Sequence, residues 1–347
     1  MRAIVIGAGI GGLSAAVALK KAGIDCTVFE AVKEIRPVGA AISIWPNGVK
    51  CMQHLGMGDI IETYGGPMRF MAYKDYRRGD TLTRFSLAPL VERTGGRPCP
   101  VSRSELQREM LDFWGREAVQ FGKRVTRAEE NADGVTVWFS DGTTAHGDFL
   151  IAADGSRSAL RPYVLGHKPE RRYAGYVNWN GLVDIDESIA PADQWTTFVG
   201  EGKRVSLMPV AHGRFYFFFD VPLPAGLAED RHTLRDDLSR YFSGWSPQVV
   251  QISRLVRPSA LPVMRKSSSR SRRSLTGRPT LRAATAAHTA RWPACVSLPP
   301  KPPPMRRHST RTAWLSTASA CATQCCTSPG CWVLEWMSHC PCSCGSA

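Results

Sequence analysis

The residues with the clearest chemical potential form a glycine-rich turn near the start of the chain. Gly7, Gly9 and Gly12 have the spacing G-x-G-x-x-G, and an acidic residue, Glu30, follows them. Gly7 permits a tight turn, Gly9 lets a pyrophosphate approach the backbone, and Gly12 lets a helix pack closely on a strand. Free N–H groups at the helix start attract phosphates, and Glu30 can accept hydrogen bonds from ribose hydroxyls. The pattern predicts a dinucleotide-binding site.

The elements that must hold this turn can be recognised on both sides of it. Residues 3–6 predict a buried strand, residues 13–21 a helix, and residues 26–29 a second strand that ends at Glu30. The uncharged stretch 3–19 also resembles a signal peptide or a short membrane span. Four glycines between positions 7 and 12 would break such a helix, so we expect neither.

Two further polar residues follow predicted elements. Arg103 lies at the head of a helix that Ser102 or Ser104 can cap, and Asp154 ends the apolar run 149–153. From spacing alone, Arg103 is typical of a solvated residue in a first helical turn, and Asp154 of an ordinary turn after a strand. Between them, a strand is predicted at 120–125, and strands at 125–130, 135–139 and 143–146 are joined by Asp-Gly turns.

The pattern changes after residue 171 to long alternating strands. We predict an antiparallel sheet from residues 176–185, 195–199, 204–209 and 214–221, followed by a helix at 234–242. Three residues of this sheet that carry polar groups are Asn178, Arg204 and Tyr216. From the pattern alone, Asn178 is typical of a polar residue in a turn or strand, Arg204 of a charge at a strand end, and Tyr216 of a core aromatic residue. The predicted domains are 1–171 and 172–250.

Charge and cysteine are unevenly distributed along the 347 residues. The net charge of +14 would suit a nucleic-acid partner, but residues 1–250 contain 30 basic and 29 acidic residues. Only three of the 11 cysteines fall in that part, which gives no disulfide framework and no metal-ligand set. Residues 1–250 therefore look like a cytoplasmic enzyme that needs no metal, nucleic acid or membrane.

The glycine motif with Glu30, then Arg103, then Asp154-Gly155, in this order, resembles the class A flavoprotein monooxygenases. The stretches 37–43, 173–182 and 200–209 are similar to the urate-hydroxylating branch of that family. The resemblance covers residues 1 to about 250. It implies an α/β fold, with a Rossmann-like FAD-binding domain and an antiparallel β-sheet substrate domain, as in para-hydroxybenzoate hydroxylase.

The resemblance also assigns roles to particular residues. Asn178 and Tyr216 are expected to bind the substrate, and Arg204 to lie where flavin and substrate meet. A guanidinium keeps its proton at ordinary pH and therefore cannot accept another one as a base. We interpret Arg204 as a fixed positive group that orients an anion. The residues implied to contact FAD are Gly7, Gly9, Gly11, Gly12, Glu30, Ala31, Ser43, Arg103, Val125 and Asp154.

The implied reaction converts urate, O2 and NADH or NADPH to 5-hydroxyisourate, water and the oxidised nicotinamide. NADH or NADPH would reduce FAD, and the reduced flavin would add O2 to give a C4a-hydroperoxide that urate attacks. We expect a monomer. Three alternatives stay open: the same chemistry on another small anionic aromatic such as a hydroxybenzoate, a dehydrogenase that uses NAD alone, and nucleic-acid binding through the basic C-terminal part.

Residues 251–347 have a different composition, rich in Ser, Arg, Pro and Cys, with 14 basic residues and one acid, Glu335. They match nothing in the family and lack its later Gly-Asp motif, so we expect this part to be aberrant, disordered or out of frame. An inactive, truncated flavoprotein fragment is therefore a further hypothesis. The cluster His339, Cys340, Cys342 and Cys344 has spacings that fit no structural zinc module.

Overall fold

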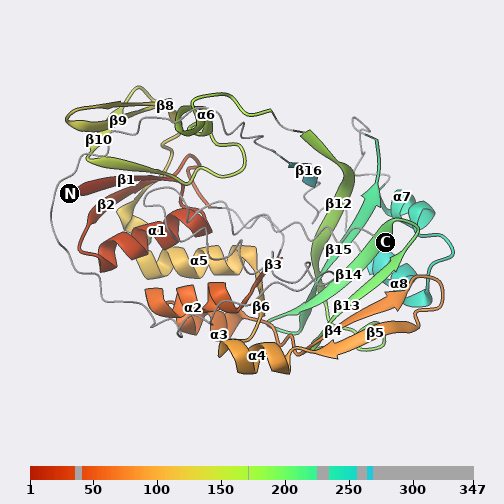
Figure 1. The fold of residues 1–347 in the computed structure, drawn as a ribbon. Coiled ribbons are helices and arrows are strands. Elements are labelled where there is room, and N and C mark those ends of the chain that lie inside the picture. The colour runs from red at the N-terminus through yellow and green to blue at the C-terminus, as the bar shows by residue number, and fades with distance from the viewer. Residues whose placement is uncertain (36–40, 171, 225–233, 256–263, 269–347) are drawn as a thin grey trace, which may run out of the picture. The chain divides into compact units, whose positions relative to one another are not determined.

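The computed structural model describes residues 1–35, 41–170, 172–224, 234–255 and 264–268 (Figure 1). All of them lie in one of the two compact units into which the chain divides. The stretch 36–40, which carries part of the resemblance, and residues 269–347, with the Cys340 cluster, lie outside the described residues.

A four-stranded parallel sheet organises the N-terminal part. Its order is β11-β1-β2-β7, with β1 Arg2–Ile6, β2 Asp25–Phe29, β7 Val119–Gln120 and β11 Phe149–Ala152. Helices α1 (Ile10–Lys21) and α5 (Arg103–Trp114) pack together beside it through a shared apolar cluster that includes Val5, Leu13 and Leu106. The predicted Rossmann-like unit is confirmed, although α1 begins three residues before the predicted start.

A three-stranded antiparallel sheet follows, in the order β10-β9-β8. Its strands are β8 Val125–Asn131, β9 Gly134–Phe139 and β10 Thr144–Gly147, as the Asp-Gly turns predict. The strand predicted at 120–125 is wrong. The chain turns at Gly122, where φ is +74°, because β7 ends at Gln120 and β8 must run back against β9.

Short elements connect these sheets to the rest of the chain. Strands β3 (Ala41–Ile44) and β6 (Cys99–Ser102) form a two-stranded ribbon. The remaining helices of this part are α2 Pro46–Leu55, α3 Gly58–Tyr64, α4 Ala88–Thr94, the 3-10 helix Arg116–Ala118 and α6 Arg161–Leu165.

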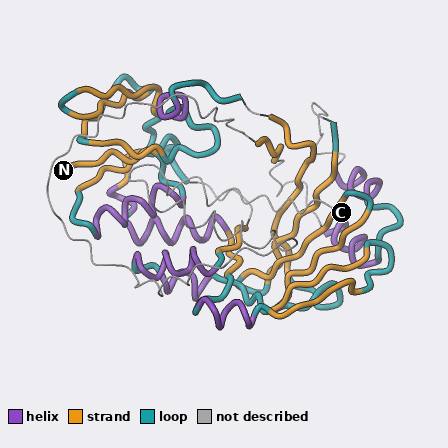
Figure 2. Tube along the Cα trace, in the orientation of Figure 1, coloured by secondary structure: helices purple, strands orange, loops and turns teal. Residues whose placement is uncertain are grey.

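A seven-stranded sheet dominates the second part, in the order β16-β12-β15-β14-β13-β4-β5 (Figure 2). The four predicted strands are confirmed as β12 Arg172–Asp184, β13 Gln194–Gly200, β14 Lys203–Val210 and β15 Arg214–Pro222, paired antiparallel. Strands β4 (Phe70–Asp75) and β5 (Thr81–Ser86) extend it, and β4 pairs in parallel with β13. On the other side, β16 (Met264–Ser268) pairs with β12.

The two faces of this sheet differ in chemistry because successive side chains of a strand point to opposite sides. One face supplies Trp179, Phe217 and Phe219 to a core that helices α7 (Leu234–Tyr241) and α8 (Pro247–Leu255) complete. The other face carries the polar residues that we consider next. Helix α8 buries Ile252, so described structure continues past residue 250.

Two absences are established for the part of the chain that the structure describes. None of its helices has the length and apolar character needed to cross a membrane. Within the same residues, no three His, Cys, Asp or Glu side chains are grouped so that they could hold a metal ion.

Candidate functional site

The glycine turn has the geometry that a bound pyrophosphate requires. Gly7 adopts φ +105°, and a Cβ there would lie 2.4 Å from the Ala153 oxygen. A Cβ on Gly12 would lie 1.8 Å from the Gly7 oxygen, so helix and strand touch through backbone alone. At Gly9, the N-cap of α1, nothing lies within 4 Å of the Cβ position. Two glycines are thus needed for packing, and the third leaves open space at the helix N-terminus.

Glu30 lies directly beside this turn, where β2 ends. Its Oε2 accepts a hydrogen bond from the Ala8 N–H (2.8 Å), and its Oε1 accepts one from the Val32 N–H (3.0 Å). Each carboxylate oxygen keeps a lone pair for a ribose hydroxyl. The Lys123 N–H donates to the Glu30 carbonyl, and Val125 packs in one apolar cluster with Phe29. Glu30, its half-buried neighbour Ala31 and Val125, all predicted to contact FAD, are therefore neighbours.

Helix α5 reaches the same turn from the other side. Gln107 Nε2 donates a hydrogen bond to the Ala8 carbonyl (2.9 Å). Arg103 lies one helical turn earlier, hence on the same face of α5. Arg103 is half-buried, and its guanidinium has no hydrogen-bond or ion-pair partner among the described residues. Ser102 is the N-cap residue, but its side chain pairs with Ser104 instead of capping the helix, contrary to the prediction.

Asp154 follows β11 and has one satisfied and one unsatisfied oxygen. Oδ2 accepts hydrogen bonds from the Ala159 and Leu160 N–H groups (2.7 and 3.3 Å), which orders the turn before α6. Oδ1 is buried without a hydrogen-bond partner within the described part of the chain. A buried carboxylate oxygen left unpaired is costly, so this atom needs a donor such as a ligand hydroxyl.

These features fit the expected FAD. Open backbone at Gly9, the Arg103 guanidinium and Asp154 Oδ1, the last two without a hydrogen-bond partner in the described part of the chain, are the groups that a pyrophosphate and a polyol chain would satisfy. Gly11 lies half-buried in the first turn of α1. Ser43, on β3, accepts a hydrogen bond from Trp45 Nε1 (3.1 Å), and within the described residues no hydrogen bond joins its side chain to the glycine turn.

The polar face of the large sheet holds a hydrogen-bonded row that crosses three strands. Asn178 on β12, Asp220 on β15 and Arg204 on β14 are direct cross-strand neighbours. Asn178 Nδ2 donates to Asp220 Oδ1 (2.6 Å), and Arg204 Nε donates to Asp220 Oδ2 (2.5 Å). Asn180 Nδ2 donates to Asn178 Oδ1 (2.5 Å). Asn178 is 2% exposed, whereas the Arg204 side chain is 48% exposed. The row thus ends in an accessible cation.

Aromatic side chains lie beside this row. The Arg204 guanidinium lies 5.3 Å from the centre of the Phe218 ring, and the Tyr216 ring lies 5.6 Å from the same ring. Burial raises the pKa of the Tyr216 phenol. Asp220 adds to this rise, while Arg204 opposes it. Tyr216 is therefore neutral at physiological pH, and its hydroxyl can donate a hydrogen bond.

The predicted site residues form two groups. The glycines, Glu30, Val125, Arg103 and Asp154 gather around the α1 N-terminus, while Asn178, Arg204 and Tyr216 gather on the sheet. Among the described residues, no hydrogen bond or ion pair joins a member of one group to the other. The two parts are tied through Arg214, which donates to both Glu105 oxygens (2.8 Å each). A buried cluster also contains Ala41 of β3 together with Tyr216.

Sequence reasoning missed two residues of these groups. Gln107 was detectable because it lies four residues after Arg103 and therefore on the same helical face. Asp220 was detectable as the one charge in the aromatic run 215–221, in phase with Tyr216. Its two partners come from other strands, which a single sequence does not pair.

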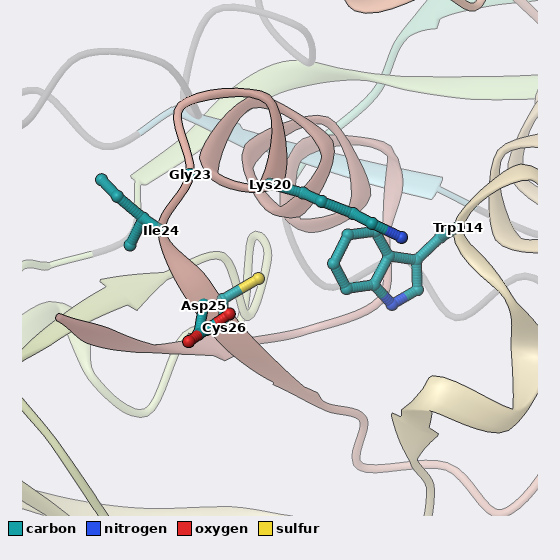
Figure 3. A pocket seen from close by; sticks show the side chains of 6 residues that line it. All are labelled: Lys20, Gly23, Ile24, Asp25, Cys26 and Trp114. Carbon is teal, nitrogen blue, oxygen red and sulfur yellow. The ribbon is translucent and has the colours of Figure 1, made fainter.

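A separate cavity of about 250 Å³ lies at the opposite, C-terminal end of α1. Two of the side chains that line it, Lys20 and Trp114, are close together (Figure 3), and the Lys20 ammonium lies 5.4 Å from the centre of the Trp114 ring. Burial raises the pKa of the Cys26 thiol there, which makes it a poor nucleophile. The cavity contains no predicted site residue. Its lining comprises Lys20, Gly23, Ile24, Asp25, Cys26 and Trp114.

Comparison with known proteins places these observations in a family. The family described as FAD binding domain matches residues 1–239. FAD-dependent urate hydroxylase of Klebsiella oxytoca is 83% identical over 252 residues, which are 73% of this chain and 66% of that protein. The chain thus spans just under two thirds of the relatives that it matches.

Two crystal structures are also similar. They are Klebsiella pneumoniae HpxO complexed with FAD and uric acid, and its R204Q form complexed with FAD. Each has a TM-score of 0.75 and 74% identity, and each match covers 77% of this chain. The matches cover 68% and 69% of those two chains, respectively.

Proposed function

Because the chain belongs to the FAD binding domain family, we propose that it carries the N-terminal part of an FAD-dependent monooxygenase that hydroxylates urate. The similarity to FAD-dependent urate hydroxylase of Klebsiella oxytoca and to HpxO complexed with FAD and uric acid supports this proposal. The matched residues contain both groups of site residues described above.

One observation carries the choice of substrate class. Arg204 presents a half-exposed guanidinium at the end of an otherwise buried polar row. Its Nε is used by Asp220, and its two terminal nitrogens have no partner among the described residues. Two adjacent N–H groups of a guanidinium match two acceptor atoms of a planar anion. A flat, anionic ring such as urate fits this arrangement and the aromatic rings beside it.

The side chains have distinct tasks in this proposal. Arg204 binds the anionic form of the ring and stabilises the negative charge on it, without removing a proton. Tyr216 offers its neutral hydroxyl as a donor and its ring as a stacking surface. Asn178 keeps one N–H and one oxygen lone pair for the substrate, because Asp220 and Asn180 use the others. When bound, FAD would supply electron transfer from a nicotinamide and the activation of O2.

The chain's own residues would hold FAD in a defined orientation. Gly9 and the α1 N-terminus would receive the pyrophosphate, and Glu30 the adenosine ribose. Arg103 would neutralise phosphate charge, and Asp154 Oδ1 would accept a hydroxyl hydrogen bond. Use of NADH or NADPH, a monomeric state and a cytoplasmic location stay predictions, which a cofactor comparison, size-exclusion chromatography and cell fractionation would test.

The decisive experiment measures NADH or NADPH oxidation by the purified 347-residue protein with added FAD. We expect urate to stimulate the rate and to be consumed, whereas 4-hydroxybenzoate and 6-hydroxynicotinate do neither. Stimulation by one of those compounds instead of urate would favour the second hypothesis, hydroxylation of another anionic aromatic. Rapid NAD-dependent oxidation of a substrate without any flavin absorbance would favour a dehydrogenase and would contradict the proposal.

A further inference from the structure

Among the described residues, Asp220 alone forms hydrogen bonds with both Asn178 and Arg204, two of the side chains assigned to the substrate. Its side chain is 9% exposed, so it lies behind these two groups and away from solvent. We propose that Asp220 is a positioning residue, which fixes the guanidinium of Arg204 and the amide of Asn178 for binding the anionic ring. The proposal rests on the proposed function, because it assigns a role within the same substrate site.

The contact with Arg204 uses a particular nitrogen. Asp220 accepts from Nε, the nitrogen nearest the chain, so the plane of the guanidinium is set while both terminal nitrogens stay available. A long, half-exposed arginine otherwise samples many rotamers, and the entropy lost when substrate binding restricts it to one rotamer weakens the affinity. A charge-assisted hydrogen bond donated to a buried carboxylate removes most of that freedom before the substrate arrives.

The contact with Asn178 sets the direction of the amide. An ionised carboxylate only accepts hydrogen bonds, so Nδ2 of Asn178 must face Asp220 and Oδ1 must face the Asn180 amide. The remaining N–H of Asn178 then has a fixed direction toward the substrate. An asparagine at position 220 can either donate or accept, and would leave both orientations of Asn178 open.

An opposing effect makes the proposal testable. Asp220 is negative, and on charge alone it should repel an anionic ring near Arg204. Removing its charge without changing its shape, in Asp220→Asn, therefore separates two outcomes. Positioning predicts weaker urate binding, whereas a purely electrostatic role predicts tighter binding.

The experiment uses the full 347-residue chain with saturating FAD. We expect Asp220→Asn to weaken urate binding at least about tenfold in equilibrium dialysis and to raise the share of NADH oxidation that ends as hydrogen peroxide. FAD affinity should stay unchanged. The matched control is Asp112→Asn, which removes an aspartate from an exposed pair with Arg116 and should change none of these values. If Asp220→Asn does not fold, Asp220→Glu, which keeps the charge but displaces it, should raise the peroxide share.

A double-mutant cycle with Arg204→Gln then separates positioning from general structural damage. Because Asp220 also positions Asn178, we expect the double variant to lose less urate affinity than the sum of the two single losses. The same cycle on the melting temperature, measured without urate, should show that losing both partners destabilises less than the sum of the single losses. Additive losses in both cycles, or unchanged or tighter urate binding in Asp220→Asn, would overturn the positioning role. A wild-type protein that neither binds urate nor oxidises NADH faster in its presence would refute the proposed function. The cycle on the melting temperature would still decide whether Asp220 holds Arg204.

Discussion

At the scale of single residues, Arg204 is the group on which the proposed chemistry depends most. In Arg204→Ala we expect NADH oxidation to continue while urate hydroxylation falls about 100-fold or more, because the anion then loses the positive group that orients it. The lost product should appear as hydrogen peroxide, measured beside NADH and urate in the same reaction. The control is Arg116→Ala, whose guanidinium pairs with Asp112 on the surface. An Arg204→Ala protein that couples NADH oxidation fully to hydroxylation would contradict the assignment.

Tyr216 gives a pH-dependent prediction for stability. Its pKa is raised in the folded protein, so above the ordinary tyrosine value of about 10 the unfolded chain loses its proton first. The free energy of unfolding should therefore fall as pH rises, by up to about 1.4 kcal/mol per pH unit for this one group. Tyr216→Phe should reduce that slope in urea unfolding between pH 9 and about 11. Burial also raises the pKa of Tyr176, and that contribution is common to both proteins. Equal slopes would show that Tyr216 ionises normally.

At the scale of elements, the strand–turn–helix unit separates packing from ligand binding. Gly12→Ala places a Cβ onto the Gly7 oxygen, so we expect a loss of about 3 kcal/mol or more in the free energy of unfolding. Gly9→Ala meets no atom within 4 Å and has φ −75°, which alanine adopts readily. It should cost at most about 1 kcal/mol as a poorer N-cap, yet weaken FAD binding strongly. Urea unfolding and quenching of flavin fluorescence measure the two effects. Unchanged FAD affinity in Gly9→Ala would show that the pyrophosphate does not approach there.

The elements themselves were largely predictable where local chemistry determines them. The Asp-Gly turns identify β8 to β10, and alternation identifies β12 to β15. Strand β4 was missed because its partner β13 lies more than a hundred residues further along the chain, and β5 was missed with it because it pairs with β4. Ser102 shows the same limit at a helix end, since its hydroxyl pairs with Ser104 although its position is that of a cap. Asp220 was missed for a similar reason, because its role depends on two neighbouring strands.

At the scale of the whole molecule, the two groups of site residues depend on different parts of the chain. The predicted FAD contacts all lie between Gly7 and Asp154, and the proposed substrate contacts lie between Asn178 and Tyr216. The residues that match the FAD binding domain family, 1–239, therefore contain both groups, linked by the Arg214–Glu105 ion pair. It also has nearly balanced charge, which favours a small-molecule substrate over nucleic acid.

The flavin content of the purified protein tests whether this matched part is enough to bind FAD. The chain spans 66% of the Klebsiella oxytoca relative, and the Gly-Asp motif implied by the resemblance has no counterpart in residues 251–347. We expect the 347-residue protein to retain clearly less than one FAD per chain. The residues proposed to hold the adenosine and pyrophosphate are present, but the Gly-Asp motif is missing. A hybrid in which the remaining third of that relative replaces residues 253–347 should bind FAD stoichiometrically, and Gly9→Ala in the hybrid should reverse the gain. Flavin released on denaturation, divided by protein concentration, gives the ratio. One FAD per chain in the 347-residue protein would show that the glycine turn, Arg103 and Asp154 hold the cofactor without that segment.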